Sequence, residues 1–66
     1  MTCERFLRRR EVELLTGKPR SIIYSEMRSG TFPKPVRLSP KGKAVAWRES
    51  EIAAWQAERI AERDAG

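Results

Sequence analysis

The chain has 66 residues; 39% are apolar, and 14 Lys or Arg against 9 Asp or Glu give a net charge of +5. This length fits one small domain, and the apolar content is too high for a disordered chain. Such a domain has little room for a deep catalytic pocket. The sequence also has no His and no glycine-rich phosphate loop, so we expect no enzyme and no cofactor.

The charge is unevenly distributed along the chain. Residues 1–48 hold 12 basic and 4 acidic side chains, a balance of +8, whereas residues 49–66 hold 2 basic and 5 acidic ones, a balance of −3. A basic body with an acidic tail favours a polyanion as the partner of the body. The plainer alternative is a soluble surface that happens to be rich in arginine.

Two features of the sequence indicate the cellular compartment: the single cysteine and the absence of long apolar runs. Cys3 has no second Cys or His for a disulfide or a zinc site, which fits a reducing cytosol. No apolar run approaches the about 20 residues of a membrane span, and no signal peptide is evident. We therefore expect a complete single-domain cytoplasmic protein, residues 1–66, that binds no metal and no membrane.

The first third of the chain has the pattern of two short helices. The segment Arg5–Arg8 precedes them as a short strand or as a plug that sends Phe6 or Leu7 into the core. The run RREVELLTG predicts a helix of about two turns that ends at Gly17. Pro19 suits the first position of the next helix and Gly30 its end. The glycine-containing connection of about three residues predicts a helix-turn-helix over about 10–29.

The residues after Gly30 predict a hairpin. Pro33 and Pro35 break the helix, and Val36 and Leu38 alternate with polar residues as in a half-buried strand. The run SPKGK has the chemistry of a type I turn, in which Gly42 is free to take a positive φ. A second strand with Val45 and Trp47 on one face completes a two-stranded wing over about 36–47.

A third helix is predicted over about 49–63, with acidic residues in its first turn. The expected fold class is mainly α with a small β-hairpin, a winged helix-turn-helix of three helices and a two-stranded wing. Phe32 is expected to be a core plug rather than a platform for base stacking. The remaining predicted core residues are Val12, Leu15, Ile23, Met27, Val36, Val45, Trp47, Ile52 and Trp55.

The second helix presents a polar face opposite Ile23 and Met27. In a winged helix-turn-helix this helix enters the major groove, where Arg bonds guanine edges and hydroxyls bond phosphates or bases. Glu26 is the one residue of this helix that opposes a polyanion. The candidate contacts of the helix and of the turn before it are Lys18, Arg20, Ser21, Tyr24, Ser25 and Arg28.

The hairpin supplies a second group of candidate contacts. Lys41 and Lys43 lie at its tip, and Arg37 points away from the face of Val36. We expect these three cations to bind phosphates, the alternative being lysines that only keep the hairpin soluble. The run Arg8–Arg10 is a weaker candidate for the same role.

These motifs resemble the AlpA family of small prophage-associated transcriptional regulators, relatives of phage excisionases and of the DNA-binding part of MerR-type regulators. The resemblance runs from about Phe6 to Ile60 and is carried by EVELLTGKPRSIIYSEMRSGTFPKPVRL and AVAWRESEIAAW. It implies a bacterial, nucleoid-associated protein that binds promoter or attachment-site DNA through Arg20, Ser21 and Tyr24.

Several positions depart from the family pattern. Pro19 stands where the family usually has a Ser cap, Ile22 where Thr is common and Ser25 where Arg is common. Glu26 and Arg9 replace apolar residues. The loss of the Arg at position 25 predicts a target sequence that differs from those of relatives.

Three functions follow as hypotheses. The first is a sequence-specific regulator that binds double-stranded DNA, alone or as several copies on repeated sites. The second is an excisionase that bends attachment-site DNA and directs an integrase. The third is a protein-interaction adaptor that uses the third helix, with Ile60 and the acidic tail as its surface. The expected protein partners are a second copy of the chain, an integrase and RNA polymerase.

Overall fold

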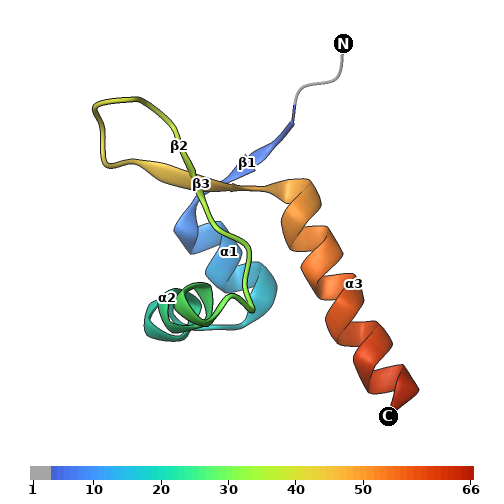
Figure 1. The fold of residues 1–66 in the computed structure, drawn as a ribbon. Helices are drawn as coiled ribbons and strands as arrows, with labels where there is room; N and C mark the ends of the chain where they lie inside the picture. The colour runs from blue at the N-terminus through green and yellow to red at the C-terminus, as the bar shows by residue number, and fades with distance from the viewer. Residues whose placement is uncertain (1–3) are drawn as a thin grey trace.

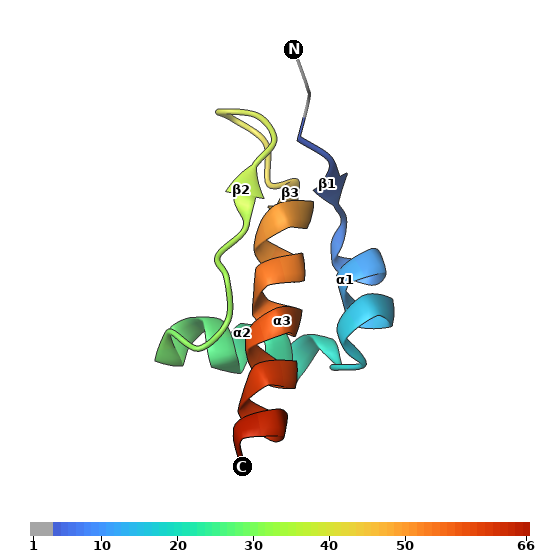
Figure 2. The ribbon, with the colours of Figure 1, turned by 90° about the vertical axis from the view of Figure 1, so that its right-hand side faces the viewer.

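The computed structural model describes residues 4–66, so Cys3 lies outside the described residues. The elements follow in the order β1 (Phe6–Leu7), α1 (Arg9–Thr16), α2 (Arg20–Ser29), β2 (Val36–Arg37), β3 (Val45–Arg48) and α3 (Glu49–Ala65). Figure 1 shows α1 and α2 on one side of the strands, while α3 continues from β3 and runs beside them. In Figure 2, α2 crosses the direction of α1 and α3. The predicted winged helix-turn-helix is confirmed, and the third helix extends two residues beyond its expected end at 63.

Two left-handed glycines end the helices of the helix-turn-helix. Gly17 (φ 71°) donates its N–H to the carbonyl of Glu13, and Gly30 (φ 82°) donates to Met27. Glycine adopts this conformation without the steric cost that a Cβ imposes. The three-residue connection between the helices is confirmed. Pro19 is not the first helical residue as expected. It is the extended N-cap (ψ 163°), and its carbonyl accepts the N–H groups of Ile22 and Ile23.

The sheet has three strands rather than the two of the predicted wing. Their order is β1-β3-β2, all antiparallel, and Leu7 pairs with Trp47. Both readings of the N-terminal segment therefore hold, because β1 is a strand and Leu7 is also a buried plug. The strand β2 ends at Arg37, so Leu38 lies outside it and is exposed.

A side chain closes the turn of the wing. The N–H of Gly42 donates to Ser39 Oγ over 2.9 Å. Within residues 4–66 only Gly17 and Gly30 have positive φ, so Gly42 does not use the freedom expected of it. A Cβ at position 42 would lie 2.5 Å from Ser39 Oγ. Glycine is therefore suited to this position by space rather than by backbone conformation.

The core lies between the sheet and the three helices. Its buried members are Leu7, Val12, Ile23, Phe32, Trp47 and Ile52, against which Met27, Val45 and Trp55 pack as partly buried side chains. Phe32 is confirmed as a plug and meets Trp55 edge-on, with ring centroids 5.1 Å apart.

Two residues that were predicted for the core do not belong to it. Leu15 is 51% exposed, because α1 is only two turns long and directs Val12 inward. At this edge the contact with α3 is polar, since Gln56 Nε2 donates to the carbonyl of Leu15. Val36 is partly buried and does not belong to the core cluster.

The start of α3 is held by the segment that leads into β1. The N–H of Glu49 donates to the carbonyl of Arg5 over 2.9 Å. Glu4 Oε1 accepts from both the N–H and the hydroxyl of Ser50, at 3.1 and 2.6 Å. These hydrogen bonds from Ser50 lower the pKa of Glu4 below its ordinary value of 4.5. None of the helices in residues 4–66 combines the length and the apolar composition needed to cross a bilayer.

Candidate nucleic-acid interface

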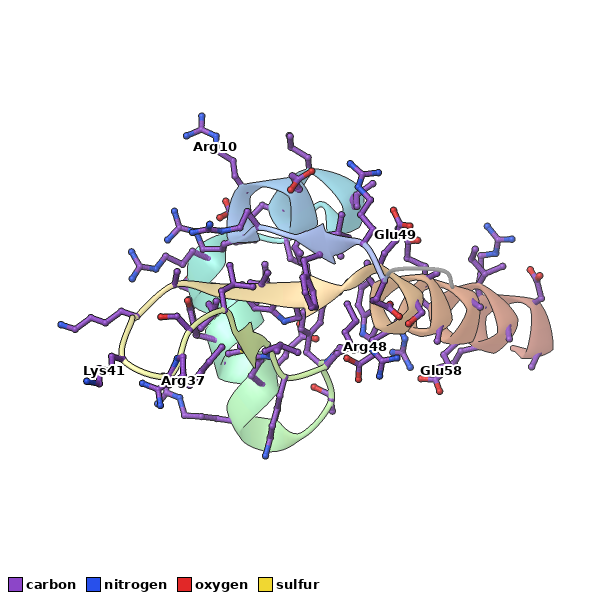
Figure 3. The ribbon with its side chains drawn as sticks, turned by 90° about the horizontal axis from the view of Figure 1, so that it is seen from above. Arg10, Arg37, Lys41, Arg48, Glu49 and Glu58 are labelled. Carbon is purple, nitrogen blue, oxygen red and sulfur yellow. The ribbon has the colours of Figure 1, made fainter. Side chains whose placement is uncertain are left out.

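The basic side chains fall into two groups. Within residues 4–66, six lie within 4.0 Å of a carboxylate, and eight do not. We call these eight the unpaired cations: Arg8, Arg10, Arg20, Arg28, Lys34, Arg37, Lys41 and Lys43. None of them belongs to α3. Figure 3 shows Arg10, Arg37 and Lys41 on the side away from α3. The fold therefore separates uncompensated positive charge from the acidic helix.

The polar face of α2 lies at the surface, as predicted. Ile23 is fully buried and fixes the rotation of the helix, so Arg20, Tyr24 and Arg28 follow one another at intervals of one turn on another face. The Arg20 guanidinium lies over the Tyr24 ring, 5.6 Å from its centroid. This cation–π contact restricts the guanidinium to a position along the helix surface. Ser21 and Ser25 are exposed beside this row.

Lys18 is engaged within the protein. Its Nζ lies 2.6 Å from Glu26 Oε2 and 5.6 Å from the centroid of the Trp55 ring. The Glu26 carboxylate, which opposes a polyanion when α2 is considered alone, is thus neutralised across the turn. Lys18 therefore does not join the unpaired cations, although its role as a phosphate contact remains a prediction.

A hollow of about 400 Å³ lies between α1, α2 and β3. We call it the α1 hollow; it is lined by Arg8, Arg9, Arg10, Tyr24, Lys43, Ala44 and Val45. Arg9 Nε lies 2.9 Å from Glu13 Oε2, but its N–H finds no hydrogen-bond acceptor, so this contact is ionic only. The structure thereby brings the wing residue Lys43 to the arginine run at the start of α1.

The N-cap of α1 leaves an arginine side chain free. Arg8 is the extended N-cap, and its backbone N–H donates to Glu11 Oε1 over 3.0 Å. Because an arginine side chain has no acceptor, it cannot cap the helix in return, and it remains available to the α1 hollow.

A second hollow, of about 610 Å³, lies between the end of α2 and the segment that follows it. We call it the linker hollow; it is lined by Tyr24, Met27, Arg28, Lys34 and Pro35. The sequence reading missed Lys34. Its signal is a lysine between two prolines, four residues after the Gly30 cap, where the chain is held extended. The segment between α2 and β2, which we call the linker, is anchored to the core, because Trp47 Nε1 donates to the carbonyl of Pro33 over 2.9 Å.

The predicted wing cations do not form one cluster. Lys43 lies in the α1 hollow, whereas Arg37 and Lys41 are exposed on β2 and at the tip of the wing (Figure 3). No three His, Cys, Asp or Glu side chains gather as possible metal ligands in the part of the chain that the structure describes.

Comparison with known proteins agrees with this arrangement. The family described as Prophage CP4-57 regulatory protein (AlpA) matches residues 5–60. The chain belongs to the AlpA family. It is 53% identical over all 66 residues to an uncharacterized protein, ORF88, of Enterobacteria phage P4, of which it spans 73%. No solved structure matches the chain. The protein is therefore a member of a family of prophage regulatory proteins.

The structure gives a physical reason for one departure from the expected AlpA pattern. Glu26, which replaces an apolar residue, is accommodated by its ion pair with Lys18. Pro19, in place of a Ser cap, leaves the start of α2 without a side-chain hydrogen bond. Ile22 is 42% exposed, and nothing in the structure explains the replacement of Thr at this position.

Proposed function

We propose that the protein is a transcriptional regulator of a prophage or mobile element that binds double-stranded DNA in a sequence-specific manner. The observation that carries this proposal is the position of the unpaired cations, all of which lie between residues 8 and 43 and none in α3. Uncompensated charge on one part of a surface is what phosphate binding requires, because each neutralised phosphate releases counterions. Membership of a prophage regulatory family supports the same conclusion.

In this proposal α2 is the recognition helix. A major groove about 12 Å wide accepts one helix, and the row of Arg20, Tyr24 and Arg28 on one face of α2 supports this assignment. Arg20 is the first candidate for a bidentate contact with guanine. Ser21, Ser25 and Arg28 contact bases or phosphates, and Arg37, Lys41 and Lys43 contact the backbone. We assign to Lys18 the support of α2 through Glu26.

Two substitutions test the proposal, one of a residue expected to contact a base and one of a residue expected to contact a phosphate. On its preferred site, Arg20→Ala should cost about 1–3 kcal/mol and relax specificity, because a base contact is lost. Lys41→Ala should weaken binding to every sequence and reduce the salt dependence by about one counterion. Arg63→Ala is the matched control, since it removes a cation from α3.

The measurement is fluorescence anisotropy over a range of salt concentrations, with DNA that flanks the protein's own gene and a scrambled duplex of equal length. If Arg20→Ala and Lys41→Ala both bind as the unmodified protein does, the assignment of the surface is wrong. If the unmodified protein shows no salt-dependent binding to any duplex, an adaptor that uses α3 becomes the better function.

An excisionase is the second candidate function, because it would use the same surface and also contact an integrase. The observation that favours a protein partner is Ile60, which is 53% exposed on a helix without unpaired cations. An excisionase should bend attachment-site DNA, and prophage excision should depend on the protein. Excision that proceeds equally without the protein would remove this candidate and leave the regulator.

A further inference from the structure

Tyr24 borders two separate hollows. The α1 hollow opens from Tyr24 toward α1 and β3, and the linker hollow opens toward the last turn of α2 and the segment that holds Lys34. Segments distant in the sequence therefore bring their cations to two sides of one side chain. Tyr24 is itself partly buried, and it is the residue that the linings of the two hollows share.

The walls of both hollows are cationic and contain no carboxylate residue. In the α1 hollow Arg8, Arg10 and Lys43 lie without an acidic partner, and in the linker hollow Arg28 and Lys34 do the same. Like charges that gather in this way repel one another, and a bound anion relieves the repulsion. The chemistry of both hollows thus selects phosphate.

The cations of both hollows are carried by ordered backbone. Lys34 lies between two prolines, and the preceding proline is tied to Trp47 in the core. Lys43 lies two residues before the start of β3, whose partner β1 leads into α1. Lys34 is thus tied to the core through Pro33, and the segment of Lys43 is joined to that of α1 through the pairing of β1 with β3, an arrangement that lowers the cost of ordering two phosphate sites at once.

We propose that the two hollows hold backbone phosphates from the two opposite strands of one duplex, with Tyr24 as the ridge that enters the major groove between them. This inference rests on the proposed function and extends it to a two-strand contact that includes Lys34. A major groove has one sugar–phosphate backbone along each edge, so cations on both sides of an inserted ridge meet both strands. A single strand offers only one backbone and fills one hollow.

Phosphate ethylation interference on each labelled strand of the bound DNA site tests this arrangement. The unmodified protein should give two groups of sensitive phosphates, one on each strand, that face each other across a major groove. Lys34→Ala should abolish interference in one group and leave the other. The double substitution Arg10→Ala and Lys43→Ala should do the reverse, and Arg63→Ala, on α3, should change neither group.

Binding measured over a salt series gives an independent readout. Lys34→Ala should reduce the slope of log K against log salt by about 1, and the double substitution should reduce it by about 2. The single-stranded form of the same site should bind at least tenfold more weakly than the duplex. Lys34, Arg10 and Lys43 are exposed, so thermal unfolding of the variants should match that of the unmodified protein.

The outcomes separate this inference from the function on which it rests. Sensitive phosphates on one strand only, loss of the same group by both sets of substitutions, or equal affinity for single and double strands would overturn the two-strand contact while DNA binding stands. An unmodified protein that protects no duplex would overturn both.

Discussion

Replacing Lys18 with Met tests the ion pair that links the turn to α2. Met is similar to Lys in shape but lacks the ammonium, so the Glu26 carboxylate loses its partner at 2.6 Å and the Trp55 ring loses the cation 5.6 Å from its centroid. The two side chains are 27% and 26% exposed, between a surface pair and a buried one. Surface pairs contribute about 0–1 kcal/mol, and breaking a fully buried pair costs about 3–5 kcal/mol, so we expect a loss of about 1–2 kcal/mol.

That loss is large for a domain of this size. At about 0.05–0.15 kcal/mol per residue the total stability is about 3–10 kcal/mol. A loss of 1 kcal/mol lowers the melting temperature of so small a domain by about 4–8 °C, so Lys18→Met should lower it by about 5–15 °C. Urea denaturation of Lys18→Met, Glu26→Gln and the double variant gives the coupling energy directly. Single effects that add to within about 0.3 kcal/mol would refute the ion pair.

The same variant decides what Lys18 does toward DNA. If Glu26 holds the ammonium in the complex as well, Lys18→Met leaves the salt dependence of binding unchanged, whereas Lys41→Ala lowers it. A slope reduced by about 1 in Lys18→Met would show that Lys18 leaves Glu26 for a phosphate, which is the role predicted from the sequence.

Three further predictions concern stability. Trp47→Phe should cost about 2–4 kcal/mol in urea denaturation, because the Pro33 carbonyl loses its donor and the smaller ring leaves a void; a cost below about 1 kcal/mol would contradict this. Because hydrogen bonds from Ser50 lower the pKa of Glu4, this carboxylate stabilises the fold above pH 4.5, and the stabilisation is lost as pH falls through the lowered value. The difference in stability between the unmodified protein and Glu4→Gln should therefore shrink below pH 4.5, and a constant difference would argue against the contact. Gly30→Ala should cost about 1–2 kcal/mol in thermal unfolding, because φ is 82° and nothing within 4 Å obstructs the methyl group; an unchanged melting temperature would contradict it.

The charge pattern relates the fold to the proposed function. Arg5 and Arg48 are paired with acids around the start of α3, whereas the cations of α2 and of the wing have no such partners. In Figure 3, Arg48, Glu49 and Glu58 accordingly lie at the α3 side. The acidic helix packs through Ile52 and leaves the opposite part of the molecule to the unpaired cations. A basic body and an acidic tail thus become separate surfaces of one small domain.

Local signals in the sequence were sufficient for the three helices, the hairpin and their order, but left the segment of β1 open as a strand or a plug. Gly17 and Gly30 are confirmed as the ends of the two short helices, because a left-handed residue is a property of the local backbone. The periodicity around Ile23 similarly determined which face of α2 is buried, and hence which residues remain at the surface. The AlpA motifs were also recognisable from the chain alone, and the family match confirms them.

Only the tertiary structure decided which charges meet. Lys18 and Glu26 are eight residues apart in the sequence and lie on either side of the start of α2. Glu4 bonds Ser50, which is 46 residues away in the sequence. Helical or strand periodicity gives no information about such pairs. The same holds for Lys34, which joins Arg28 in the linker hollow because Trp47 fixes the linker. The sequence by itself thus determined the helix α2 and its polar face. Packing decided which cations are neutralised and which remain unpaired, because that depends on contacts between segments distant in the chain.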